Sequence, residues 1–322
     1  MKRPLVLILA GLLALIPIGG CAEAEEASVG MAVEFMDHAA CAYISQDKGW
    51  FEEEGLKLTA YESYVTGMSL ASALARDEIE VAYICLVPAI NVYANGGVPI
   101  KIVAGTHKYG YGLVVDPDKI KTINDLEEPD IRLGCVREGG AVDVLLRKAI
   151  DYYHLGQDNI LNNVQRMNPP KLVLAIKTGQ LDAAFLPEQW ATMAEEFGFE
   201  MLLMSQDIWP DMQGSVLVVK QDLIDNHPEM VRKLVTVSQR ATDWINEHPE
   251  EAAEIMARQL QVTDELEITT EVLLRSMGRL EYTTDIDPSM VQATVDYIAG
   301  LGYIKSSFNA EDILDLRFLE GE

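Results

Sequence analysis

Two glycine-containing loops in the sequence could bind a small ligand through their backbone. A glycine lets a ligand approach bare main chain, and the free N–H groups at a helix start attract an anion. The same residues also suit a tight turn and ordinary helix caps, so both interpretations stay open. Each loop opens a predicted helix; the first consists of Thr66, Gly67, Met68 and Ser69, and the second of Glu138, Gly139, Gly140 and Ala141.

Further residues that could contact the ligand fall into two groups: residues that follow the ends of predicted strands, and residues with aromatic rings. Ligands of open α/β sheets bind beyond the carboxyl ends of the strands, which is where the non-aromatic candidates fall. Each candidate also has a structural alternative, since a histidine caps helices and rings fill cores. The non-aromatic residues are His38, Ala39, Cys85 and Leu86, and the aromatic ones, which suit a planar ligand, are Tyr109, Tyr111 and Trp190.

Two carboxylates bear on the charge of the expected ligand. Glu138 stands at the second glycine loop, and Glu188 follows a predicted strand. In a site that excludes water they would repel nitrate or a sulfonate and would suit an amine, a hydroxyl or an aminopyrimidine. Arg137 would supply the opposite charge. The sequence therefore leaves an anionic and a heteroaromatic ligand both open.

The sequence predicts no catalytic residue, metal site or cofactor. It contains no G-x-S-x-G, H-E-x-x-H or P-loop motif. A metal site formed by Cys41, Cys85, Cys135 and His38 is an alternative, but no C-x-x-C pair is present, which argues against such a site. A Cys41–Cys85 disulfide and three buried free thiols both stay open.

Strand-like and helix-like segments alternate along the chain, which predicts an α/β fold with mainly parallel sheets. Between the strands, apolar residues at 142, 145, 146, 149 and 150 mark one face of a helix. Residues 221–322 show helical patterns only and predict a helical layer over one lobe. The predicted strands span 29–35, 56–60, 79–86, 100–104, 113–115, 131–136, 181–186 and 216–219.

Several segments, in order, resemble the solute-binding proteins of ABC importers for nitrate, sulfonates, taurine and thiamine-pyrimidine precursors. The resemblance covers about residues 28–260, and the ordered set of motifs is more specific than any one of them. The segments are KGWFEEEGL at 48–56, IEVAY at 79–83, GVPIKIVA at 97–104, GQLDAAF at 179–185, NHPE at 226–229 and WINEHPEEA at 244–252.

This resemblance implies a type II periplasmic-binding-protein fold, in which two α/β lobes close over a solute. Lobe I would comprise residues 28–107 and 213–322, and lobe II residues 110–206. The hinge crossings would lie near 106–112 and 206–214. The expected partners are an ABC permease and its ATPase, and the protein is expected to be a monomer. The alternatives are an enzyme resembling thiamine-pyrimidine synthase and the ligand-sensing lobe of a signalling system.

The first residues predict export and a lipid anchor. Lys2 and Arg3 precede an apolar run of 5–18, which fits a signal peptide over residues 1–20. Cys21 follows two glycines, as in a lipobox, so we expect a lipid on Cys21 and a tether over 21–27. The protein would then be anchored to the membrane and face the extracytoplasmic side.

Composition limits the class of partner. Across 322 residues the formal charge is 25 − 51 = −26, and 49% of residues are hydrophobic. This balance is typical of a globular protein long enough for two lobes. A surface this acidic repels phosphate backbones, so no nucleic-acid partner is expected.

Overall fold

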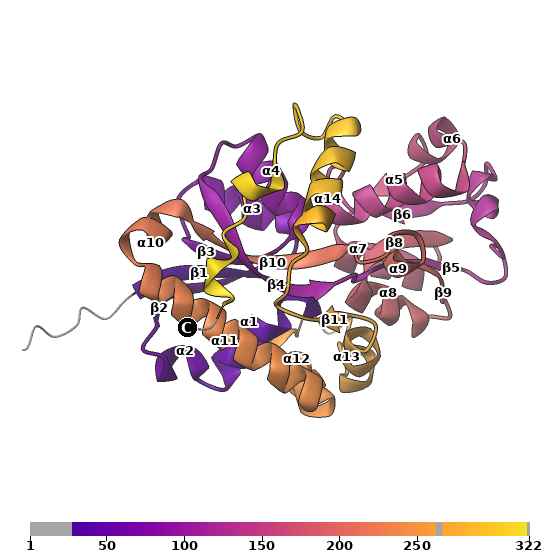
Figure 1. Ribbon diagram of the computed structural model, residues 1–322. Helices are drawn as coiled ribbons and strands as arrows, with labels where there is room; N and C mark the ends of the chain where they lie inside the picture. The colour runs from indigo at the N-terminus through magenta and orange to yellow at the C-terminus, as the bar shows by residue number, and fades with distance from the viewer. Residues whose placement is uncertain (1–27, 262–265, 321–322) are drawn as a thin grey trace, which may run out of the picture.

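The computed structural model describes residues 28–261 and 266–320. In this part of the chain the strands form two sheets, each flanked by helices, which lie side by side in Figure 1. None of the described helices is long and apolar enough to cross a bilayer. The predicted signal peptide, the tether and Cys21 lie outside the described residues.

The six-stranded sheet has the order β11-β4-β10-β3-β1-β2. β1 pairs in parallel with β2 and β3, whereas β10 runs antiparallel to β3 and β4. β3 is buried along its whole length, as expected of an apolar strand covered on both faces. The strands are β1 (Ser28–Glu34), β2 (Lys57–Tyr64), β3 (Val81–Cys85), β4 (Ile100–Lys108), β10 (Gln213–Lys220) and β11 (Glu281–Tyr282).

The five-stranded sheet has the order β7-β6-β8-β5-β9. β6 pairs in parallel with β7 and β8, and β5 runs antiparallel to β8 and β9. The strands are β5 (Tyr111–Val115), β6 (Leu133–Cys135), β7 (Gln165–Arg166), β8 (Ala183–Pro187) and β9 (Glu200–Met204).

Most strands of each sheet run in one direction, as predicted, although both sheets also contain antiparallel pairs. In the six-stranded sheet β1 to β4 run against β10 and β11, and in the five-stranded sheet β6 to β9 run against β5. The chain leaves the six-stranded sheet through β4 and returns to it through β10. Since one strand leaves and the other returns, the two pair antiparallel. Tyr109 and Gly110, both with positive φ, connect β4 to β5 and redirect the chain. This connection lies within the predicted hinge range 106–112, and the stretch between β9 and β10 includes most of 206–214.

Helices cover the faces of both sheets. Around the six-stranded sheet they are α1 (Ala40–Asp47), α2 (Trp50–Glu53), α3 (Gly67–Ala75), α4 (Leu86–Ala94), α10 (Gln221–Asn226), α11 (Pro228–Glu247), α12 (Pro249–Gln259), α13 (Thr270–Met277) and α14 (Pro288–Gly300). Around the five-stranded sheet they are α5 (Ala141–Tyr153), α6 (Gln157–Leu161), α7 (Pro169–Lys177), α8 (Glu188–Glu195) and α9 (Ser205–Ile208). Short 3-10 turns are η1 (Asp37–Ala39), η2 (Ile123–Glu127), η3 (Ala310–Asp312) and η4 (Leu316–Phe318).

The sequence patterns explain the helices that matter for the site. In α5 the predicted apolar face, with Leu145 and Leu146 at its centre, is buried. α11 begins at Pro228, whose missing N–H costs nothing at a first helical position. Residues 221–320 are not purely helical as predicted, because β11 pairs with β4 at the edge of the six-stranded sheet. A strand of two residues is too short to leave an alternating pattern in the sequence.

Candidate functional site

A cavity of about 50 Å³ lies where loops of the two sheets meet. This volume holds a few water molecules or a small solute. Most of the wall comes from the carboxyl ends of strands and the helix starts that follow, the place expected for a ligand in this class of sheet. The lining residues are Glu34, Met36, Val65, Thr66, Gly67, Met68, Cys85 and Pro88 from one side, and Tyr111, Val136, Arg137, Gly140, Ala141, Val142, Pro169 and Pro187 from the other.

Helix N-termini reach this cavity from both sheets, among them those of α3 and α5. The first-turn N–H groups of a helix lack intrahelical partners and carry partial positive charge. At α3, Thr66 Oγ1 accepts from the Ser69 N–H at 3.3 Å. At α5 the N-cap is Gly140, which has no side chain to accept a bond. The first turn of α5 is therefore available to a ligand with acceptor oxygens.

Gly67 lets the backbone of α3 lie directly against Glu34. A Cβ at this position would overlap Glu34 Oε1 and would lie 2.8 Å from Pro88 Cγ. The absence of a side chain at Gly67 is thus a steric requirement of this wall.

Among the described residues that line the cavity, Glu34 is the one carboxylate. It is fully buried at the end of β1, and its Oε2 accepts from the Cys85 thiol at 2.9 Å. No partner is found for Oε1 among the described residues. Burial raises the pKa of Glu34 to about 7, against the opposing effect of the Cys85 hydrogen bond.

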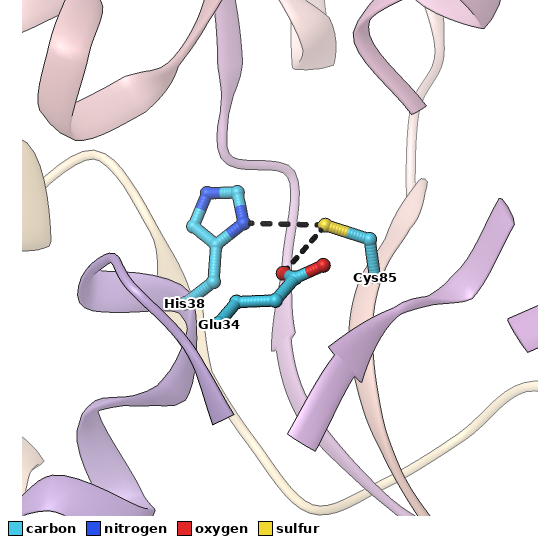
Figure 2. A group of neighbouring side chains, drawn as sticks. All are labelled: Glu34, His38 and Cys85. Carbon is cyan, nitrogen blue, oxygen red and sulfur yellow. Dashed lines mark hydrogen bonds between the residues drawn. The ribbon is translucent and has the colours of Figure 1, made fainter. Parts of the chain in front are cut away.

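His38 does not line the cavity but lies behind Cys85. Its Nε2 is 2.8 Å from the Gly110 carbonyl oxygen, and its Nδ1 is 3.7 Å from Cys85 Sγ (Figure 2). Its ring also lies 4.3 Å from that of His107, between ring centroids. Burial, with a smaller effect of His107, holds the pKa of His38 well below its usual value. Burial also raises the pKa of the Cys85 thiol.

The structure brings about half of the predicted site residues together. The predicted residues that line the cavity are Thr66, Gly67, Met68, Cys85, Tyr111, Gly140 and Ala141. Others neighbour it without lining it: Ser69 contacts Thr66, Gly139 precedes Gly140, and Leu86 follows Cys85. Ala39 is buried beside His38, and Tyr109 lies in the connection between β4 and β5.

Three further predicted contacts do not line the cavity. Glu138 is exposed and pairs with Arg147, Nη2 to Oε1, at 2.7 Å. Glu188 is buried and accepts from Arg279 Nη1 at 3.1 Å. Trp190 is fully buried. The structure thus places Glu34, and neither Glu138 nor Glu188, in the cavity wall, so the charge argument applies to Glu34.

The cavity-lining residues that the sequence prediction omitted include Glu34, Pro88, Pro169 and Pro187. Glu34 has a recognisable signal, because it is the last residue of β1 and every other buried residue of that strand is apolar. An acid at the carboxyl end of such a strand indicates a site rather than a solvated face. The prolines carry no such signal, since proline is also common at strand ends and helix starts. Arg137, which the sequence offered as a positive charge, is exposed and lines the cavity.

The three cysteines in the described part of the chain are buried free thiols. The disulfide between Cys41 and Cys85, which the sequence left open, is not formed. Cys41 and Cys135 also do not join His38, whereas Cys85 does. The histidine and one cysteine of the rejected four-residue metal site are therefore neighbours, with Glu34 as the third member.

Comparisons with known proteins agree with this fold. The chain is 26% identical to a putative binding protein of Brucella abortus over 97% of both chains. The periplasmic nitrate-binding protein NrtA of Synechocystis superposes with a TM-score of 0.78 at 15% identity, covering 92% of this chain and 88% of NrtA. The alkanesulfonate-binding protein SsuA of Xanthomonas axonopodis, bound to MOPS, gives 0.77 at 13% identity, covering 91% and 99%.

These likenesses confirm the predicted two-sheet, periplasmic-binding-protein type of fold. The model of one family matches residues 22–260, which is more than two thirds of the sequence and includes most of the cavity-lining loops. The chain therefore belongs to the NMT1-like family.

Proposed function

We propose that this protein is the solute-binding component of an ABC importer and traps a small solute between its two sheets. The observation that carries the proposal is the cavity between the two sheets, which is lined from both sides by strand ends and helix starts. Relatives described as binding proteins for nitrate and for aliphatic sulfonates support the same role. Capture needs no catalytic group, and none is assigned.

The ligand we favour is a small organic anion with an apolar part. The N-termini of α3 and α5 and the guanidinium of Arg137 supply positive potential at one cavity. Methionine, valine and proline side chains make up much of the remaining wall, which suits an alkyl group. A sulfonate or a carboxylate with a short carbon chain fits both features, and burial, which raises the pKa of Glu34 to about 7, favours the neutral carboxyl and so weakens its repulsion of the anion.

A heteroaromatic solute, such as a pyrimidine, is the second candidate because of Glu34. Glu34 lines the cavity, and its buried Oε1 is an acceptor without a partner among the described residues. A buried acceptor without a donor costs about 1–3 kcal/mol. An amino or ring N–H group of a ligand would supply that donor.

A thermal-shift screen with one variant pair separates the two candidates. The screen covers taurine, alkanesulfonates, nitrate, aminopyrimidines and aromatic acids, with a chelator present. A true ligand at 100 times its dissociation constant adds about 2.7 kcal/mol to stability. Glu34→Gln should leave anion binding intact or stronger and should abolish binding of an amino-heteroaromatic. Glu138→Gln is the matched control, since Glu138 is an exposed carboxylate outside the cavity. If no compound shifts the wild-type transition, the proposal for these ligand classes fails.

We further propose that residues 28–107 with 213–322, and residues 110–206, act as two lobes that close over the solute. A ligand that touches both sheets favours the closed arrangement by its extra affinity for that state. Small-angle X-ray scattering with and without ligand tests this. An unchanged radius of gyration would argue against closure.

The lipid anchor on Cys21 rests on the sequence pattern and is proposed with the importer role. In this role the protein is a monomer that faces the extracytoplasmic side and delivers its solute to a permease driven by an ATPase. Cys21→Ser should move the protein from the membrane fraction to the soluble fraction. Its persistence in membranes would refute the lipid site. Turnover of a bound compound would instead favour the enzyme alternative.

A further inference from the structure

Glu34, His38 and Cys85 form a buried three-residue cluster at the floor of the cavity. One ligand atom from each residue, a carboxylate oxygen, an imidazole nitrogen and a sulfur, lies within 4.8 Å of the other two. Figure 2 shows the imidazole and the carboxylate both directed toward the sulfur. The residues come from the end of β1, from η1 and from the end of β3.

The second nitrogen of His38 is held in the way that metal-binding histidines require. Nε2 lies 2.8 Å from the carbonyl oxygen of Gly110, and a carbonyl only accepts, so Nε2 carries the proton and donates. Nδ1 is then the unprotonated nitrogen, and it points at Cys85. A histidine ligand of a metal usually donates its other N–H to a carbonyl or carboxylate in this manner. Gly110 makes this contact possible, because a Cβ there would lie 2.7 Å from Nε2.

One distance in the cluster approaches that of a tetrahedral site. With metal–sulfur bonds of about 2.3 Å and metal–nitrogen bonds of about 2.0 Å, tetrahedral angles place sulfur and nitrogen about 3.5 Å apart. The observed Sγ–Nδ1 distance is 3.7 Å. The Sγ–Oε2 distance is 2.9 Å, shorter than the tetrahedral spacing, and belongs to the hydrogen bond that the Cys85 thiol donates. A small rotation of the Glu34 carboxylate would lengthen the Sγ–Oε2 distance toward the tetrahedral value.

One observation indicates that the cluster lacks a hydrogen-bonding partner, and a second indicates that the cluster can be reached from the cavity. Glu34 Oε1 is fully buried and has no partner among the described residues. Glu34 and Cys85 both reach the cavity wall, whereas His38 does not. An ion could therefore enter from the cavity, and the coordination position left after three protein ligands would face the cavity.

We propose that Glu34, His38 and Cys85 bind one zinc-class ion, with its fourth position open to a solute in the cavity. A thiolate and an imidazole select zinc over magnesium or calcium, which prefer oxygen ligands alone. Binding replaces the thiol proton of Cys85, which leaves to the buffer, and an anionic solute would complete the tetrahedron. The site shares the cavity of the proposed solute site, so the inference deepens that function and needs a separate test.

The test is metal titration of the full-length protein purified with a chelator. Zinc is titrated against a chromophoric competitor, and cobalt(II) serves as a spectroscopic probe. The wild type should bind one equivalent of zinc. Its cobalt form should show the visible bands of a tetrahedral ion and the near-ultraviolet charge-transfer band of a thiolate ligand. Absence of the charge-transfer band, or of stoichiometric zinc binding, overturns the proposal.

Conservative variants locate the site. Cys85→Ser should abolish the charge-transfer band and weaken zinc binding by about 100-fold or more, while His38→Gln and Glu34→Gln should each weaken binding at least about 10-fold. Cys41→Ser is the matched control, because Cys41 is an equally buried free thiol outside the cluster. Weakening by Cys41→Ser but not by Cys85→Ser would overturn the assignment. If Cys85→Ser does not fold, the wild-type cobalt spectrum and His38→Gln still decide.

The solute screen in chelator keeps the two proposals distinguishable. Solute binding without zinc binding rejects the metal site and leaves the importer role in place. Zinc binding without any solute shift in chelator supports the metal site, and the screen is then repeated with one equivalent of zinc. The absence of a shift with zinc present counts against the proposed organic ligands.

Discussion

Arg279 joins the two halves of the molecule, and its removal should be costly. It follows α13, which packs beside the six-stranded sheet, and its guanidinium contacts α8 of the other half. Nη1 donates to Glu188 Oε1 at 3.1 Å and to Thr192 Oγ1 at 3.0 Å, and Nη2 donates to Glu195 Oε1 at 2.9 Å. The Glu188 side chain is only 2% exposed, so water cannot replace the arginine.

The expected cost of Arg279→Met follows from this burial. Removing one partner of a buried ion pair costs about 3–5 kcal/mol, because the other charge stays buried and unpaired. The Arg279 side chain is 26% exposed, which weakens the pair through solvent screening. We therefore expect the free energy of unfolding to fall by about 2–4 kcal/mol. Arg275→Met, which removes an arginine that is 45% exposed and pairs with Glu196, should cost about 0.2–1 kcal/mol.

The stability lost in Arg279→Met should depend on pH, because the protonation state of Glu188 changes with pH. Burial raises the pKa of Glu188 even with Arg279 present, and Arg279 opposes that rise. Without the arginine the folded-state pKa rises further above the unfolded-state value. Such a group binds its proton more tightly in the folded state, so stability falls as pH rises from the unfolded pKa through the folded one. The variant should therefore lose more stability at about pH 8 than at about pH 5.

Urea unfolding of both variants at the two pH values measures these differences. Adding Glu188→Gln to Arg279→Met should recover part of the loss, because it removes the unpaired buried charge. A stability loss in Arg279→Met no larger than that in Arg275→Met, or a loss that is the same at both pH values, would contradict a buried ion pair between Arg279 and Glu188.

Two further substitutions test the packing of the site and of the second sheet. Gly67→Ala should lower stability by about 1–3 kcal/mol in thermal unfolding, because its Cβ would overlap Glu34. Gly300→Ala, with no atom within 4 Å of the added carbon, should not lower it. Asp182→Asn should cost about 1.5–3 kcal/mol at neutral pH, since Arg132 Nη2 donates to Asp182 at 2.6 Å. Because hydrogen bonds from Arg132 lower the Asp182 pKa, the difference from wild type in urea unfolding should narrow as pH falls below about 3.9, and a constant difference would contradict this.

Most of the fold could be predicted because its signals are local. The apolar run that became β3 and the apolar face of α5 depend only on neighbours in the sequence. The direction of β10 could not be predicted in this way. It depends on where the chain crosses between sheets, and β10 lies far along the chain from both β3 and β4, with which it pairs. Similarly, β7 and β11 are too short for a periodic pattern.

The loops of the candidate site were predictable for the same reason, whereas the chemistry at its floor was not. Gly67 and Gly140 each stand between a strand pattern and a helix pattern, so the sequence marks them directly. Glu34 and Cys85 are far apart in the chain and meet because β1 and β3 pair in parallel, with Val33 opposite Tyr83. Shifting that register by two residues would keep every side chain on its face of the sheet and would still separate the carboxylate from the thiol. Whether these strands are neighbours, and in which register, is a tertiary property that the spacing of residues does not encode. The same β1–β3 register buries the Glu34 carboxylate and the Cys85 thiol beside each other at the cavity. A buried polar group at this place needs a hydrogen-bonding or metal partner.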